Sequence, residues 1–152
     1  MARMLTQNFS LDEFVFSQTA ARLGLDNTAD VTVLRNLQRL AGTLEEVRSR
    51  LGDVAILVSS GYRSPALNKA VKGAKNSAHL SGLAVDFTAP RFGTVLQTAK
   101  AVAASDIAYD QVIYEFGRWV HLGLAPEGEI VRRENLSIMV AGQYFNGLRN
   151  VA

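Results

Sequence analysis

Apolar side chains recur at helical spacing in the first third of the chain. From about Asp30 to Leu51 they return every three or four residues, the pattern of a helix with one buried face; these positions are Val33, Leu34, Leu37, Leu40, Ala41, Leu44, Val47 and Leu51. Upstream, Ser10 and Glu13 have the spacing of a capping box, which satisfies free backbone N–H groups at a helix start. The pattern therefore predicts one helix from Leu11 to Leu23, ended by Gly24, and a second, longer helix after it.

After residue 54, short apolar runs bounded by glycine, proline and polar residues replace the helical pattern. Such runs predict strands, and they occur at Ala55–Ser59, Leu83–Phe87, Val112–Glu115, Trp119–Leu122 and Ser137–Ala141. The first run should form a buried strand, and the third and fourth are close enough to form a hairpin. Short helices are predicted from Pro65 to Val71 and from Thr94 to Ala104, with a polar loop at Lys72–Ser81. No pattern assigns the tail around Gln143–Leu148.

Helices precede strands along the chain, which favours an α+β fold over a βαβ repeat. We expect a small antiparallel sheet with helices from the amino-terminal half packed against it. All of this fits one domain, residues 1–152, because that length can bury a sizeable single core. The content of 48% hydrophobic and 20% charged residues is that of an ordinary globular protein.

Charge and cysteine content exclude several kinds of partner and site. The net charge is only +2 and no stripe of Lys and Arg occurs, so we expect no nucleic-acid partner. A mild positive excess would still help the protein approach an anionic polymer. The absence of cysteine excludes a disulfide framework, a thiolate metal site and a cysteine nucleophile. We expect a monomer.

The amino-terminal residues lack the apolar core of a signal peptide, and the segment from Phe14 to Leu23 is interrupted by polar residues. No run reaches the ~18 apolar residues needed to span a bilayer. We therefore expect synthesis in the cytoplasm, without a signal peptide and without stable membrane insertion. A substrate outside the cytoplasm would have to be reached by another route.

His79 and Asp86 are the first candidates for chemistry. Residues 77 to 86 read SAHLSGLAVD, and the small residues Gly82 and Ala84 would let the chain fold back so that His79 and Asp86 converge. Asp86 lies within an otherwise apolar predicted strand. An unpaired carboxylate there would lose its hydration at a large cost, which a bound cation or good hydrogen bonds would offset.

His121 is the second of only two histidines, and it too lies within a predicted strand. Two imidazoles and one carboxylate form a ligand set for Zn²⁺ that leaves a fourth position for water, the layout of a catalytic site. Zinc would lower the pKa of that water and polarise a scissile carbonyl. On the residues alone, the alternative is that Asp86 caps a turn while each histidine packs separately.

Two sequence blocks and a late Trp-x-His resemble a known family. The pattern S-x-H-x-x-G-x-A-x-D at residues 77–86, the WVH of residues 119–121 and the upstream VSSGYRSPALN of residues 58–68 resemble the zinc D-Ala-D-Ala carboxypeptidase family. That family includes VanX-like dipeptidases and phage L-alanyl-D-glutamate endopeptidases. The helical amino-terminal segments are similar to its compact, phage-associated branch, so the resemblance covers most of the chain. It implies a zinc peptidase of bacterial peptidoglycan, with His79, Asp86 and His121 as the metal ligands.

The resemblance also implies an acidic general base shortly before the last histidine. Glu115 fits this role, because the predicted hairpin would bring it towards His121. Its spacing from His121 is longer than the Glu-x-x-His of some relatives. Asp110 is the alternative base, less suited because it precedes the strand. A solvated glutamate at a strand end is the structural alternative.

Arg63 is the candidate anion-binding residue. Its guanidinium presents a fixed fork of donors, which suits a substrate carboxylate or the oxyanion that forms during hydrolysis. It follows Gly61 and Tyr62 at a predicted strand end, where a side chain can overhang a cleft. An ordinary surface arginine is the alternative.

Several nearby residues are further candidates for the site. Ser77 would either bind substrate or anchor its loop. Asn68 and Gln111 are candidates for substrate contacts or for support of other site residues. Tyr62 and Trp119 would belong to the core or to a cleft wall.

We therefore expect a zinc metallopeptidase that hydrolyses a stem-peptide bond of peptidoglycan. It would act either as a D-Ala-D-Ala carboxypeptidase or as an L-Ala-D-Glu endopeptidase. A phage or prophage endolysin fits this expectation, with a holin releasing it from the cytoplasm to the cell wall. The alternative is a non-catalytic, zinc-containing peptidoglycan-binding module. Neither a phosphate-binding loop nor His-Glu-x-x-His occurs.

Overall fold

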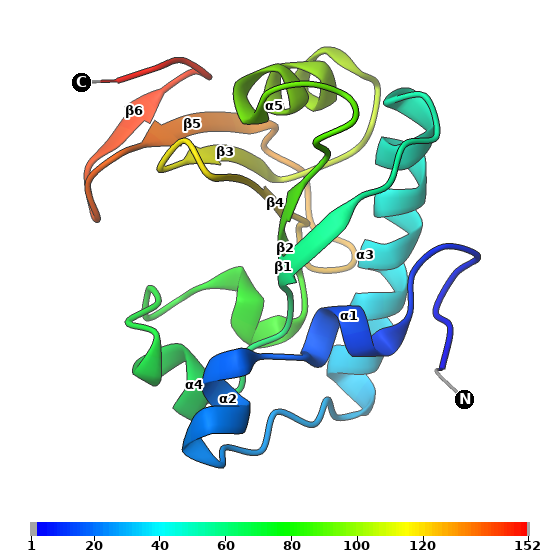
Figure 1. Ribbon diagram of the computed structural model, residues 1–152, viewed down its shortest axis with the longest axis vertical. Helices are drawn as coiled ribbons and strands as arrows, with labels where there is room; N and C mark the ends of the chain where they lie inside the picture. Colours follow the sequence, from blue (N-terminus) through cyan, green and yellow to red (C-terminus); the bar gives the residue numbers. More distant parts are fainter. Residues whose placement is uncertain (1–2, 152) are drawn as a thin grey trace.

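A single mixed β-sheet runs through the centre of the molecule (Figure 1). The computed structural model describes residues 3 to 151, so the ends of the predicted domain, residues 1–2 and 152, lie outside the described residues. Within that range six strands lie in the order β1-β2-β4-β3-β5-β6, and they are β1 Leu57–Ser60, β2 Ala84–Thr88, β3 Gln111–Glu115, β4 Trp119–Gly123, β5 Glu134–Ile138 and β6 Tyr144–Asn146. Neighbouring strands are antiparallel except β3 and β5, which are parallel. The predicted α+β class is confirmed, with a mostly antiparallel sheet.

Helices flank this sheet, and most begin at a capping side chain. They are α1 Leu11–Val15, α2 Gln18–Leu23, α3 Val31–Arg50, α4 Pro65–Ala70 and α5 Val95–Ala104, with a short 3-10 helix, η1, at Ala78–Ser81. The carboxylate of Asp30 accepts a hydrogen bond from the backbone N–H of Val33 at 2.8 Å, so α3 begins as predicted. No helix among the described residues is long and apolar enough to cross a membrane.

The first predicted helix is divided into two. The capping box is present, since the backbone N–H of Ser10 donates to the Glu13 carboxylate at 2.7 Å. The prediction of a continuous helix was wrong, because the chain is extended at Phe16 and Ser17. The Ser17 hydroxyl then accepts from the backbone N–H of Ala20 at 3.1 Å and begins α2. Gly24 ends α2 in the left-handed region, with φ of 66°.

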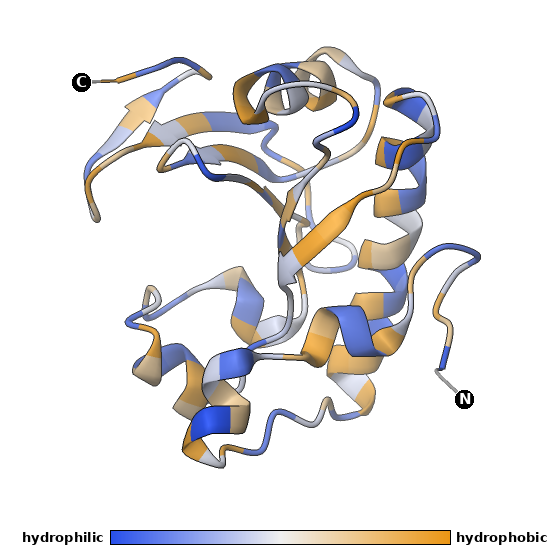
Figure 2. Ribbon diagram, viewed as in Figure 1, coloured by the Kyte–Doolittle hydropathy of each residue, from blue (hydrophilic) through white to orange (hydrophobic). Residues whose placement is uncertain are grey.

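The two faces of the sheet have different roles. Along a strand, side chains point alternately to opposite faces. One set packs with α3 and α5 in the core and comprises Val85, Phe87, Val112, Val120 and Leu122. The alternating set, which includes Asp86, Glu115 and His121, therefore points to the other face. Figure 2 shows hydrophobic and hydrophilic residues alternating along α3, as expected of a helix with one face on this core.

Three other sequence predictions differ from the structure. The strand predicted as buried at 55–59 is β1, an edge strand whose Leu57 is 53% exposed because only β2 pairs with it. The loop predicted at Lys72–Ser81 ends in η1, which contains His79. The last predicted strand begins earlier, at Glu134, because it pairs in parallel with β3, and the unassigned tail forms β6 against it.

Candidate metal centre

Three polar side chains from separate elements converge on the sheet face opposite α3. Asp86 in β2 and His121 in β4 are directly paired across the sheet, and His79 comes from η1. The Oδ1 atom of Asp86 lies 3.1 Å from Nδ1 of His121 and 3.3 Å from Nε2 of His79. All three residues are buried, and their ligand atoms lie within 4.8 Å of one another. The group could therefore hold a metal ion.

The tautomer of His79 is set by a backbone carbonyl. Its Nδ1 lies 2.7 Å from the carbonyl oxygen of Gly61, so Nδ1 carries the proton and donates it. A neutral ring then has a lone pair on Nε2, and within the described residues this buried atom has no hydrogen-bond partner. Two acceptors, Nε2 and the Asp86 carboxylate, thus face each other. A cation between them would satisfy both.

The pKa shifts within the group indicate which of its side chains carry a charge. Burial lowers the pKa of His79, because the imidazolium loses hydration. Burial would raise the pKa of Asp86, but the two imidazoles outweigh it and hold that pKa well below its ordinary value. An anionic carboxylate therefore lies beside the neutral imidazole of His79. Burial would lower the pKa of His121, but the hydrogen bond to Asp86 and the charge of that carboxylate outweigh burial and raise it, so a metal ion would displace a proton from His121.

Zinc fits this donor set. Two imidazole nitrogens and one carboxylate oxygen are common zinc ligands, and ligand atoms about 2.0 to 2.2 Å from a tetrahedral ion lie roughly 3.3 to 3.6 Å from each other. The two contacts to Asp86, at 3.1 and 3.3 Å, are close to that spacing. Three ligands leave a coordination position for water or substrate.

The β3–β4 hairpin brings Glu115 beside this group. The strands pair as predicted, with Glu115 opposite Trp119 and Ile113 opposite His121. Oε1 of Glu115 lies 3.4 Å from Nδ1 of His121 and accepts a hydrogen bond from the indole N–H of Trp119 at 3.2 Å. Burial raises the pKa of Glu115, which makes its carboxylate a stronger proton acceptor. The hairpin therefore explains how Glu115 lies beside His121 despite their long spacing in the sequence.

Arg63 borders the same site. Its backbone N–H donates to the carbonyl of His79 at 3.0 Å, and its guanidinium lies within electrostatic range of Asp86 and Glu115. One guanidinium nitrogen donates to Oδ1 of Asn68 at 3.0 Å. Asn68 is itself buried.

The remaining candidate residues each make hydrogen bonds within the protein. Asp110, the alternative base, is held by Arg132, which donates to both of its carboxylate oxygens at 2.9 and 2.6 Å. Ser77 caps η1, since its hydroxyl accepts from the backbone N–H of His79 at 3.2 Å. Gln111 lies on the same sheet face as His121 and donates to Glu134 at 2.6 Å. Substrate contacts by Ser77 and Gln111 remain predictions.

Two features of the site were not predicted. The Gly61 carbonyl that orients His79 comes from the backbone, which a sequence motif does not reveal. The indole of Trp119, expected in the core or in a cleft wall, is bound to Glu115. The sequence could have predicted this contact, because Trp119 and Glu115 flank the turn of the predicted hairpin.

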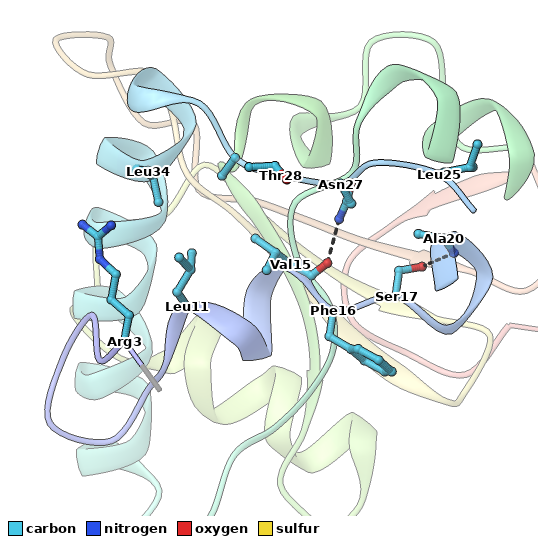
Figure 3. A pocket seen from close by; sticks show the side chains of 11 residues that line it. Arg3, Leu11, Val15, Phe16, Ser17, Ala20, Leu25, Asn27, Thr28 and Leu34 are labelled. Carbon is cyan, nitrogen blue, oxygen red and sulfur yellow. Dashed lines mark hydrogen bonds between the residues drawn. The ribbon is translucent and has the colours of Figure 1, made fainter. Parts of the chain in front are cut away.

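A separate hollow of about 510 Å³ lies at α1 and α2 (Figure 3). Its walls include Leu11, Val15, Phe16 and Leu34, and Asn27 donates to the Val15 carbonyl at its edge. None of the residues of the metal group lines it. This hollow is therefore not part of the metal centre.

Comparison with known sequences identifies the family of the chain. The sequence model of the family described as Peptidase M15 matches residues 7–123, well over half of the chain. The match contains the whole metal group together with Arg63 and Glu115. No curated protein sequence matches the chain. Family membership agrees with the buried His-Asp-His group and with the expected zinc cofactor. The chain belongs to the peptidase M15 family and is a zinc metallopeptidase.

Proposed function

We propose that this zinc peptidase hydrolyses a peptide bond in the stem of bacterial peptidoglycan. His79, Asp86 and His121 would hold the zinc ion, Glu115 would transfer the proton, and Arg63 would bind an anionic group of the substrate. The observation that carries the proposal is the 3.4 Å contact between Oε1 of Glu115 and Nδ1 of His121, in a site that Arg63 borders. Support for these roles comes from the position of Glu115 on the same sheet face as Asp86 and His121, with Arg63 within electrostatic range of Asp86 and Glu115.

Each residue has a distinct part in the proposed reaction. Zinc bound there would polarise the scissile carbonyl and lower the pKa of a bound water. The Trp119 indole orients Oε1 of Glu115, which leaves the carboxylate ready to take a proton from the attacking water. The same carboxylate then returns the proton to the leaving amine. Arg63 stabilises negative charge on the substrate by donating from its guanidinium.

Glu115→Gln tests the role of the carboxylate. The amide keeps the shape of the side chain but cannot accept a proton, so we expect loss of turnover by at least about 100-fold with zinc content unchanged. Glu129→Gln, at an exposed loop position, is the matched control and should retain activity. Unchanged turnover in Glu115→Gln would show that Glu115 is not the proton acceptor, whereas zinc-loaded wild type without turnover would leave the non-catalytic binding module as the better account.

Two bonds compete as the point of cleavage. A D-Ala-D-Ala carboxypeptidase would release the terminal D-alanine, whereas an L-Ala-D-Glu endopeptidase would separate the stem from the glycan strand. In both cases a carboxylate lies near the scissile bond, which is why Arg63 is compatible with either. Mass spectrometry of fragments from defined muropeptides identifies the bond, and absence of any cleavage by zinc-loaded protein contradicts the proposal.

We further propose a role as a phage or prophage endolysin that reaches the wall when a holin opens the membrane. Support comes from the resemblance of the motif blocks and helical segments to compact phage enzymes. Expression in a bacterial host, with and without a holin, tests this role. Lysis should require both proteins, and lysis without holin would contradict the proposed route.

A further inference from the structure

Asn68 uses its polar groups within the protein. Its Oδ1 accepts from the Arg63 guanidinium at 3.0 Å, and its Nδ2 donates to the carbonyl of Ala74 at 3.0 Å. Its backbone N–H donates to Ser64, and its carbonyl accepts from Gly73, both at 2.9 Å. With 6% of its surface exposed, Asn68 is poorly placed to contact a substrate. It is well placed to hold Arg63.

Gly73 provides the space for this pair. A Cβ atom at Gly73 would lie 2.5 Å from a terminal guanidinium nitrogen of Arg63 and 2.8 Å from the side-chain amide carbon of Asn68. Both distances are shorter than real Cβ contacts. The backbone of Gly73 is outside the left-handed region, so the glycine is needed for space and not for its φ angle. The loop after α4 is thus fitted around the Arg63–Asn68 contact.

The guanidinium keeps unused capacity for a ligand. Within the described residues, the Arg63 side chain makes one hydrogen bond, from one terminal nitrogen to Asn68, and its buried Nε has no partner. The other terminal nitrogen is therefore free to donate to a ligand. The side chain that orients the guanidinium is a neutral amide, so it fixes the donors without neutralising their charge. An aspartate at this position would form an ion pair and compete with an anionic ligand.

We propose that Asn68 is a positioning residue, which holds the Arg63 guanidinium in a fixed orientation for a carboxylate of the substrate peptide without forming an ion pair with it. This proposal rests on the proposed peptidase function and deepens it. It assigns Asn68 to act through Arg63, in place of direct contact with substrate. The ligand is a peptide that carries a free carboxylate next to the scissile bond.

Asn68→Asp tests the proposal, because it preserves the shape of the side chain and adds a charge. The binding probe is a synthetic stem pentapeptide ending in D-Ala-D-Ala, compared with versions in which each carboxylate is amidated in turn. Affinities are measured by calorimetry in the zinc-loaded Glu115→Gln background, which prevents turnover. We expect Asn68→Asp to lower the affinity for the unmodified peptide about tenfold and to leave the affinity for one amidated version almost unchanged. In the otherwise wild-type enzyme, KM should rise more than kcat falls.

Controls separate positioning from a structural role. Asn76→Asp adds the same charge at an exposed position of the same loop and should change affinity little. Gly73→Ala disturbs the same pair by a different route and should reproduce the selective loss. In an Arg63→Lys background, Asn68→Asp should add little further loss. Melting temperature and zinc content establish that each variant is folded and loaded.

The outcomes distinguish this proposal from the proposed function. If the wild type cleaves stem peptides while Asn68→Asp binds every version as well as its parent does, the positioning role is wrong and the function stands. Equal weakening of all versions indicates a structural role and also overturns the proposal. A wild type that neither binds nor cleaves the peptides overturns both.

Discussion

At the scale of single residues, the metal centre depends on which ring nitrogen of His79 faces Asp86. The Gly61 carbonyl accepts a hydrogen bond from Nδ1 of His79, so Nε2 is the ring nitrogen that faces Asp86. Asp86 in turn lies in an apolar strand, where only a cation or strong donors offset the loss of hydration. These atoms explain why two histidines and one aspartate form a metal-binding group instead of three separate polar residues.

Asp110 provides a test of the alternative base. Its carboxylate accepts hydrogen bonds from Arg132, so Asp110→Asn should retain zinc and most activity while losing about 0.5 to 1 kcal/mol of unfolding free energy at neutral pH. Kinetics and denaturant unfolding measure the two effects. A loss of activity as severe as that expected for Glu115→Gln would make Asp110 the base.

The pH dependence of this stability difference follows from the ion pair. The hydrogen bond from Arg132 lowers the pKa of Asp110 in the folded state. A carboxyl group with a lowered pKa stabilises the fold above its unfolded pKa of about 3.9, and this contribution is lost as the pH falls through the folded value. The difference between wild type and Asp110→Asn should therefore be largest near neutral pH and should vanish in acid.

At the scale of elements, the contact between α1 and the end of β1 supports the metal centre. A Cβ atom at Gly61 would lie 2.5 Å from the carbonyl oxygen and 2.8 Å from the Cα atom of Phe14, both backbone atoms that cannot rotate away. The Phe14 carbonyl also accepts from the backbone N–H of Tyr62 at 2.7 Å. A shift of this junction would move the Gly61 carbonyl that orients His79.

Gly61→Ala should therefore affect stability and zinc affinity together. We expect a loss of about 1 to 3 kcal/mol of unfolding free energy and weaker zinc binding. Gly42→Ala is the matched control, because nothing lies within 4 Å of its added Cβ in the middle of α3. That variant should gain about 0.5 to 1 kcal/mol, since alanine is the better helix former. Thermal unfolding and zinc titration of both variants would show whether the α1 junction matters.

Sequence patterns predicted elements whose cause is local. The helical spacing within α3 and the hairpin of β3 and β4 were both confirmed. The break at Ser17 was missed, because a serine cap inside a helical pattern resembles an ordinary helix position. The parallel pairing of β3 with β5 also could not be read, since it depends on a long-range contact.

The same distinction holds within the site. Adjacent motifs identified His79, Asp86 and His121, whose convergence the structure bears out. The contact of Asn68 with Arg63 depends on the loop after α4 folding back over both, which residue spacing alone does not specify.

At the scale of the whole molecule, positive charge is concentrated beside the site. From Val54 to Val85 the chain contains Arg63, Lys69, Lys72 and Lys75 and no acidic residue, although the net charge of the whole protein is only +2. The three lysines are exposed, Lys69 on α4 and the other two on the loop that follows it. This part of the molecule is suited to attract an acidic peptide or polymer.

The charge distribution predicts a salt-dependent KM. Raising ionic strength from about 0.05 to 0.5 M should raise KM for stem peptides, because exposed charges are screened over shorter distances. Lys72→Gln should lower kcat/KM about two- to fivefold at low salt and less at high salt. Lys100→Gln, exposed on α5, is the control and should have little effect. A KM that does not change with salt would contradict attraction by this surface.

Bound-metal analysis tests the central claim most directly. Wild type and His79→Ala are loaded with zinc, dialysed and measured for metal per folded chain, with circular dichroism to verify folding. His79 supplies the buried Nε2 that faces Asp86, so its removal takes away one of three ligands. We predict about one zinc ion per chain in the wild type and little in His79→Ala. Equal zinc contents in the two folded proteins would contradict the assignment of the metal centre.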